Sequence, residues 1–155
     1  MKKLFIAVLM ATAFSANAQE IYTNDQGVAL DGYDVVAYFT KGEPVKGSSQ
    51  FTTTYKGATW YFATAGHRDL FKAKSKAYEP ECGGWCAWGV AEKNTKFPVD
   101  PNTFKISDGK LYLFYNGPFG DGKFNALEPW NKDEKRLMKN MEKNWVTLSK
   151  TSVKN

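Results

Sequence analysis

The stretch FTTTYKGATWYFA, residues 51–63, decides the fold, because it holds two short strands and the turn between them. Threonine and aromatic residues dominate Phe51–Tyr55 and Thr59–Ala63, and these residue types favour strands. Lys56-Gly57 separates the two runs, and its glycine is suited to the left-handed conformation of a tight hairpin turn. The sequence therefore predicts an antiparallel β-hairpin at this point of the chain.

The apolar pattern changes to a helical period directly after this hairpin. Apolar residues recur on one side of a helix at Leu70, Phe71, Ala73 and Ala77. Thr64 is placed to cap the helix at its N-terminus, and Pro80 ends the segment that can be helical. We therefore expect one central helix of roughly three turns between these two residues.

The C-terminal half contains a second hairpin and a second helix. Phe104–Ser107 and Leu111–Tyr115 are apolar runs joined by Asp108-Gly109, a strong turn signal. The segment 117–129 is expected to be a glycine-bearing connector. Residues 132–150 predict an amphipathic helix with one apolar stripe of Leu137, Met141, Trp145 and Leu148. The fold class predicted is α+β, a small single domain of two β-hairpins, a central helix, a cysteine turn and a C-terminal amphipathic helix.

The first 18 residues have the pattern of a signal peptide. Lys2 and Lys3 precede a short apolar run over residues 4–11, and Ala16-Asn17-Ala18 supplies the small residues of a cleavage site before Gln19. The apolar run is shorter than the roughly 20 residues of a membrane-spanning helix. We therefore expect a periplasmic or secreted protein with no stable membrane insertion. The formal net charge of +5 comes from scattered lysines, so no nucleic-acid partner is expected.

Both cysteines of the chain lie in one window, Cys82-Gly83-Gly84-Trp85-Cys86. Glycines tolerate positive φ, so this window can bend tightly. Three interpretations are open. The two thiols form a disulfide, as exported cysteines commonly do; they bind a soft metal ion; or they are buried, unreactive core residues.

The metal interpretation needs the thiolates and the single histidine of the chain, His67. Two thiolates and an imidazole suit copper or zinc. Tetrahedral zinc lacks a fourth ligand here, unless water, Glu81 or a partner protein supplies it, whereas Cu(I) with two or three ligands needs none. Cys86 is the thiolate expected to matter most, with Cys82 and His67 assisting. The alternative for His67 is an ordinary hydrogen-bonded residue on the helix.

The aromatic content, 15% of the chain, also admits two interpretations. Trp85 and Trp88, with Tyr33 and Tyr61, could line a groove for a small apolar or planar ligand; core packing is the simpler explanation for most of the aromatic set. No third group is placed to orient a Cys-His nucleophile, and paired catalytic carboxylates and phosphate loops are absent from the sequence. We therefore expect a protein that is not an enzyme.

Several separated motifs in residues 32–116 resemble the YHS domain, a family related to the metal-linked TRASH domains. The motifs are Gly32–Phe39, Tyr55–Thr64, the residues His67, Phe71 and Tyr78, then Gly83–Val90 and Asp108–Leu113. Asn144-Trp145 in the last helix is similar to a pair found in exported, stand-alone YHS proteins. The resemblance divides the chain into a signal peptide (1–18), an N-terminal arm (19–31), the YHS domain (32–116), and a connector with the C-terminal helix (117–155).

The resemblance also implies a function and shows where this chain departs from its relatives. Related intracellular domains carry two cysteines at the positions that are Ala63 and His67 here, so half of their thiol set is missing. Cys86 matches the exported relatives. We expect a non-enzymatic binder of a soft metal ion, copper or zinc, or of a small ligand near the cysteine turn. The alternative is a structural module with a Cys82–Cys86 disulfide, no metal and a protein partner.

Overall fold

The structure is a computed structural model that describes residues 20–153, so the expected signal peptide over residues 1–18 lies outside the described residues. The helices are α1 (Ala37–Thr40), α2 (Ala65–Ala73), α3 (Ser75–Tyr78), α4 (Ala87–Lys93), α5 (Leu127–Lys132) and α6 (Glu134–Leu148), with short 3-10 turns η1 (Leu30–Gly32) and η2 (Glu81–Gly84). The strands are β1 (Ser48–Tyr55), β2 (Ala58–Phe62), β3 (Asp100–Ser107), β4 (Lys110–Phe114), β5 (Asn116–Phe119) and β6 (Gly122–Asn125). These elements form one small α+β domain, which confirms the predicted class. None of the helices in this range has the length and apolar character needed to cross a membrane.

The first hairpin forms where the sequence predicts it. Strands β1 and β2 pair antiparallel, and the two turn residues are left-handed, with φ of 49° at Lys56 and 75° at Gly57. Trp60 and Phe62 alternate with half-buried residues on β2 and point into the core. Helix α2 covers them, because the ring of Phe71 packs 5.0 Å from Trp60 and 5.3 Å from Phe62, between ring centroids.

The central helix begins as predicted but is interrupted. The side chain of Thr64 accepts a hydrogen bond from the backbone N–H of His67 at 3.1 Å, which makes it the N-cap of α2. The backbone leaves the helical region at Lys74, where φ is −142°, and α3 starts one residue later. One continuous helix up to Pro80 was therefore the wrong prediction. The Ser75 hydroxyl donates to the Phe71 carbonyl at 2.7 Å and helps to hold the break.

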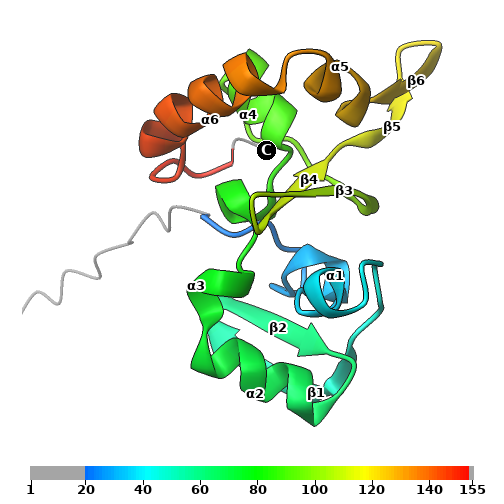
Figure 1. The fold of residues 1–155 in the computed structure, drawn as a ribbon, viewed down its shortest axis with the longest axis vertical. Coiled ribbons are helices and arrows are strands. Elements are labelled where there is room, and N and C mark those ends of the chain that lie inside the picture. Colours follow the sequence, from blue (N-terminus) through cyan, green and yellow to red (C-terminus); the bar gives the residue numbers. More distant parts are fainter. Residues whose placement is uncertain (1–19, 154–155) are drawn as a thin grey trace, which may run out of the picture.

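Strand β4 lies near the centre of the molecule. Figure 1 shows the β3–β4 hairpin between the β1–β2 hairpin with α2 on one side and helices α4 and α6 on the other. The predicted Asp108-Gly109 turn is present, with φ of 49° and 72°. Residues 111–114 are all buried, because elements cover both faces of this strand.

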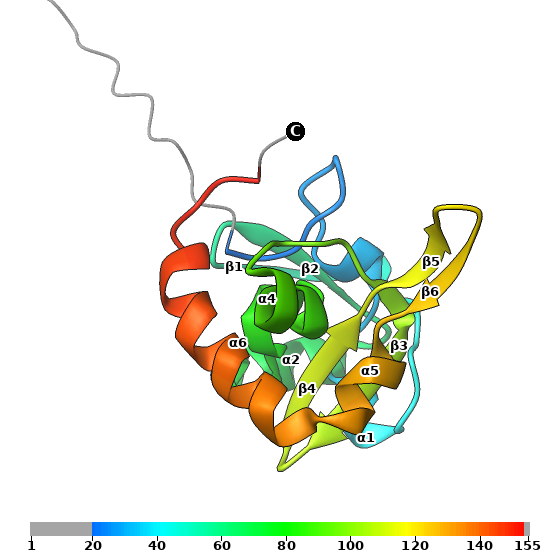
Figure 2. The same cartoon turned by 90° about the horizontal axis from the view of Figure 1, so that it is seen from above.

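The C-terminal part holds an element that the sequence did not predict. Strands β5 and β6 form a third hairpin inside the expected connector, and Figure 2 shows it projecting from the body of the domain. Phe119 near its tip is 70% exposed. Helix α6 packs against α4 with Leu137 and Met141 fully buried, which confirms the predicted stripe. The Asn144 side-chain amide donates to the Val90 carbonyl at 2.9 Å and fixes this pair of helices.

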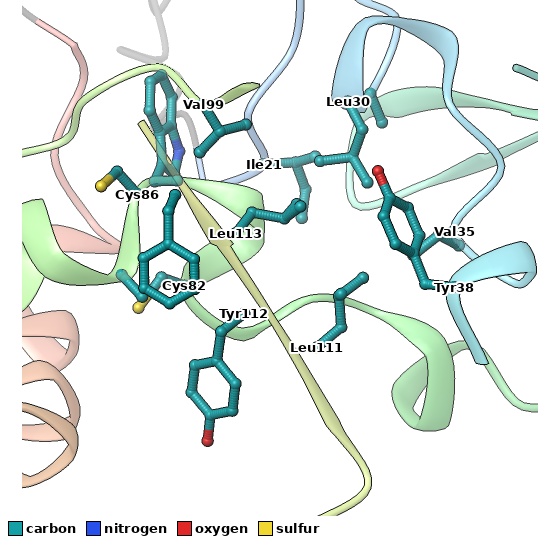
Figure 3. Close-up of a cluster of buried hydrophobic side chains, with 14 of the residues drawn as sticks. Ile21, Leu30, Val35, Tyr38, Cys82, Cys86, Val99, Leu111, Tyr112 and Leu113 are labelled. Atoms are coloured by element: carbon teal, nitrogen blue, oxygen red, sulfur yellow. The ribbon is translucent and has the colours of Figure 1, made fainter. Parts of the chain in front are cut away.

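The N-terminal arm is an integral part of the domain. Ile21 is 3% exposed, and the backbone N–H of Tyr22 donates to the Gly83 carbonyl at 2.9 Å. Further along, Val28 forms an isolated bridge to Thr59 on β2. The arm therefore joins the first hairpin to the cysteine turn, and Figure 3 shows Ile21 among the buried side chains that also include both cysteines.

Candidate functional site

The cysteine turn has an unusual backbone. Cys82, Gly83 and Gly84 are consecutive left-handed residues, with φ of 53°, 61° and 88°. A Cβ atom at Gly83 would overlap the Glu20 carbonyl of the N-terminal arm, and one at Gly84 would lie 2.5 Å from the Leu30 side chain. The two glycines therefore allow both the bend and the close approach of the arm. The positive φ expected for this window is confirmed.

Cys82 is a buried thiol at the edge of a small pocket. It is 4% exposed, and burial, then the charge of Glu81 and the proximity of Cys86, raise its pKa well above the ordinary value. The thiol is therefore protonated at neutral pH. The adjoining pocket has a volume of about 180 Å³ and is lined by Glu20, Lys56, Lys76, Glu79, Pro80, Glu81, Cys82, Gly83 and Trp145.

Charged side chains ring the mouth of this pocket. Lys56 bridges the arm to the segment after α3, with Nζ 2.7 Å from Glu20 Oε1 and 3.1 Å from Glu79 Oε2. Glu81 lies 3.7 Å from the Lys110 ammonium. The pocket thus combines one thiol, three carboxylates, two ammonium groups and one indole, a mixture that suits a small polar ligand or a hydrated ion.

Cys86 is held by backbone N–H groups of α4 and of the residue between β4 and β5. It is the N-cap of α4, and its Sγ accepts hydrogen bonds from the N–H of Gly89 at 3.5 Å and of Tyr115 at 3.3 Å. Burial raises the pKa of this thiol, while the backbone N–H groups oppose that shift because they favour the thiolate. Both cysteines are free in this structure.

His67 belongs to a different cluster. Its Nδ1 lies 2.6 Å from Asp34 Oδ2, and its Nε2 lies 3.4 Å from Thr40 Oγ1. Asp34 has no exposed surface and also accepts hydrogen bonds from the backbone N–H of Val36 and of Ala63, each at 2.9 Å. The carboxylate therefore ties α1 to the junction of β2 and α2.

The structure does not bring His67 together with the two thiols. Within residues 20–153, no three histidine, cysteine, aspartate or glutamate side chains are grouped so that they could hold a metal ion. The backbone N–H of Ala63 and the imidazole of His67 both contact the Asp34 carboxylate. Sequence reasoning did not single out Asp34; its place between Tyr33 and the apolar run from Val35 was the available signal.

The four aromatic residues considered for a ligand groove have different partners. Trp85 packs edge-to-face on Tyr22, with ring centroids 5.1 Å apart. Trp88 packs on Phe124 at 4.9 Å. In the other pair, the Lys46 ammonium lies 4.3 Å from the Tyr33 ring centroid, and the Tyr61 ring lies against Gly32.

Trp85 has a buried N–H group and a cation–π contact beside the cysteine turn. Its Nε1–H is buried and has no hydrogen-bond acceptor among the described residues. The Lys96 ammonium lies 5.8 Å from the Trp85 ring centroid and 5.5 Å from that of Trp145. Cation–π attraction thus links the cysteine turn to α6, while burial lowers the pKa of Lys96.

The described geometry offers two separate arrangements, a buried pair of thiols beside a small polar pocket and an Asp34–His67 pair that connects elements of the first half. In comparison with known proteins, no family model, curated protein or solved structure matches the chain.

Proposed function

We propose that this protein is an exported, non-enzymatic binding module of the YHS type, and that its cysteine turn binds a soft metal ion, with Cu(I) as the preferred ion. Cys82 and Cys86 are the proposed ligands, and the charged pocket beside Cys82 is the proposed route of entry. Export and the family assignment rest on the sequence patterns in residues 1–18 and 32–116.

One observation carries this proposal: two free, buried thiols share one short turn, and one of them borders a pocket. Thiolates are the ligands that Cu(I) prefers. Backbone N–H groups around Cys86 stabilise negative charge on its sulfur and so support a bound thiolate. Both cysteines belong to the buried core cluster that also contains Trp85, and this burial would limit the access of water to an easily oxidised ion.

The donor set supports copper over zinc. A structural zinc site takes four ligands in tetrahedral geometry, and the described residues bring no third histidine, cysteine or carboxylate to the two thiols. His67 is engaged by Asp34, so it is not a ligand in this proposal. Cu(I) accepts two thiolates alone, which is why it is the preferred ion in this proposal.

Proton competition gives the proposed site a pH dependence. Each thiol must lose its proton to bind metal, and burial raises the pKa of both thiols. The apparent affinity for Cu(I) is therefore expected to rise with pH through the neutral and mildly alkaline range. Each proton released contributes up to tenfold in affinity per pH unit.

The test uses untagged protein spanning residues 19–155, reduced, and titrated with Cu(I) in competition with a chromophoric chelator. We expect one ion per chain in the wild type and in His67→Ala, and loss of binding in Cys82→Ser and in Cys86→Ser. Far-ultraviolet circular dichroism of each variant checks that it is folded. Equal copper retention in the wild type and in a Cys82→Ser/Cys86→Ser double variant would sink the proposal.

Thiol counting decides between this function and the structural alternative. Protein purified aerobically from the periplasm is denatured, treated with a thiol reagent, and weighed with and without reductant, because both thiols are buried in the folded protein. Two titratable thiols agree with the binding module. No titratable thiol, together with a mass lower by two hydrogen atoms, would instead establish a Cys82–Cys86 disulfide and favour an interaction module.

A further inference from the structure

A second cavity lies far along the chain from the cysteine turn, at the base of the projecting hairpin. Its volume is about 510 Å³, and its lining is Asn116, Lys123, Phe124, Asn125, Glu128, Pro129 and Lys132. These residues come from β5, β6 and α5. Cavities of roughly 300–1,000 Å³ are typical of small-molecule sites, so this one has room for a ligand of sugar size.

Two asparagine side chains that line this cavity can each form further hydrogen bonds. The Asn116 amide nitrogen donates to Thr103 Oγ1 at 2.9 Å, and its carbonyl oxygen is buried without a partner in the described structure. Asn125 Oδ1 accepts from the backbone N–H of Leu127 at 3.1 Å, which leaves its amide nitrogen as a donor. A buried acceptor without a donor is costly, and a turn of the Asn116 side chain toward the cavity would let a ligand hydroxyl remove that cost.

The charges of the cavity favour an acidic ligand. Lys123 and Lys132 contribute two ammonium groups and Glu128 one carboxylate, so the lining has a net positive charge. The structure gives neither Lys132 nor Glu128 an ion-pair partner within the described range. At the nearby Asp100, desolvation is outweighed by hydrogen bonds from Asn102 and Thr103, which lower its pKa, and the charge of Lys123 adds a smaller contribution in the same direction.

One wall of the cavity is apolar and fixed. The Phe124 ring packs on Trp88, with centroids 4.9 Å apart, and on Phe119 at 5.7 Å. Rings held on two sides lose little freedom when a ligand packs against them. The C–H groups of a sugar ring are suited to such a surface.

The geometry points to a binding site for a hydroxylated carboxylate of sugar size, that is, a sugar acid. The carboxylate would pair with Lys123 and Lys132, hydroxyls would donate to Asn116 and Glu128 and accept from Asn125, and the sugar ring would pack on Phe124. The lining of this cavity includes neither cysteine, so sugar-acid binding can be tested separately from copper binding.

The test is a nuclear magnetic resonance titration of metal-free protein spanning residues 19–155. The probes are D-glucuronate and D-glucose, which differ only in the carboxylate. We expect glucuronate to shift the signals of Asn116, Phe124 and Asn125 saturably, with a dissociation constant of about 1 mM, and glucose to bind at least tenfold more weakly.

Matched lysine variants complete the design. Lys132→Gln is expected to weaken glucuronate binding about tenfold, whereas Lys139→Gln on α6, which is exposed and outside the cavity, leaves binding unchanged. Both substitutions lie on the surface, so folding is retained. Equal binding of the two sugars, shifts confined to other parts of the molecule, or no saturation at about 10 mM glucuronate would overturn the inference.

Discussion

At the scale of single residues, Asp34 is the most connected polar side chain of the first half of the domain. Its carboxylate has no exposed surface and accepts hydrogen bonds from the backbone N–H groups of Val36, Ala37 and Ala63 as well as lying 2.6 Å from His67 Nδ1. A buried charge is tolerated only when it is fully hydrogen-bonded. Asp34 is therefore expected to stabilise the fold, whether or not it has a role in function.

Substitution at Asp34 is expected to cost more than substitution of its histidine partner. Asp34→Ala leaves the backbone N–H groups of Val36 and Ala63 and the imidazole without their acceptor, so the free energy of unfolding should fall by at least about 3 kcal/mol. His67→Ala leaves the carboxylate with its backbone donors, so its cost should be about 1–2 kcal/mol. Urea denaturation followed by circular dichroism measures both, and an equal or larger loss for His67→Ala would contradict this assignment.

The distance between Asp34 and His67 along the chain explains why their contact was not predicted. Asp34 and His67 are 33 positions apart, and they meet only because the β1–β2 hairpin places the start of α2 beside α1. Nothing in the local sequence around His67 encodes that contact. The N-cap at Thr64, by contrast, was predictable, since its partner N–H lies only three residues away.

At the scale of elements, the cysteine turn depends on glycines for two different reasons. Gly83 needs positive φ and also has no space for a Cβ, because the Glu20 carbonyl occupies that position. Gly109 in the β3–β4 turn has φ of 72° but open space around the equivalent point. Substitutions at Gly83 and Gly109 can therefore be compared to separate the cost of left-handed backbone strain from the cost of a clash with the N-terminal arm.

Alanine substitutions at these two glycines form a matched pair. Gly109→Ala should reduce the free energy of unfolding by about 1 kcal/mol, from left-handed strain alone. Gly83→Ala should cost at least about 2 kcal/mol more and should speed hydrogen exchange at the Tyr22 N–H, whose acceptor is Gly83. Chemical denaturation measures the loss of unfolding free energy, and hydrogen exchange measures the protection of the Tyr22 N–H. Similar losses of stability in both variants would show that the close approach of the arm to Gly83 does not add to the cost.

Elements whose signals are local were predicted well. Both tight turns, Lys56-Gly57 and Asp108-Gly109, and the apolar stripe of α6 occur where expected. The hairpin over residues 116–125 was missed, because its glycines and proline resemble those of a loop and its strands have no alternating apolar pattern. Its pairing is decided by contacts with the rest of the domain, among them the packing of Phe124 on Trp88.

At the scale of the whole molecule, the two thiols are part of one continuous core. Cys82 and Cys86 belong to the buried cluster that also contains the β4 residues Leu111 and Leu113. Burial keeps both thiols protonated in the folded state, since it raises their pKa values above the ordinary value of 9.0. Folding of the reduced protein is therefore linked to proton binding at these groups.

The linkage predicts a loss of stability in alkaline solution. In the unfolded chain the thiols lose their protons near pH 9, while in the folded chain their raised pKa values delay this loss, so the contribution of the thiols to stability is constant below pH 9 and falls above it. At about pH 10 the expected loss is on the order of 1 kcal/mol per thiol. Urea titrations of reduced protein at pH 8 and pH 10 measure it, and a Cys82→Ala/Cys86→Ala variant should lose distinctly less. Tyrosines with raised pKa values, such as Tyr22 and Tyr112 at about 12, add to the fall at higher pH in both proteins.

Because Lys96 lies close to both Trp85 and Trp145, the fluorescence of these two tryptophans is expected to depend on the structure around them. A nearby ammonium group shifts and quenches indole emission, and Trp145 also lines the small cavity beside Cys82. Occupancy of that cavity, or separation of the last helix from the core, consequently changes the intrinsic fluorescence without any added dye.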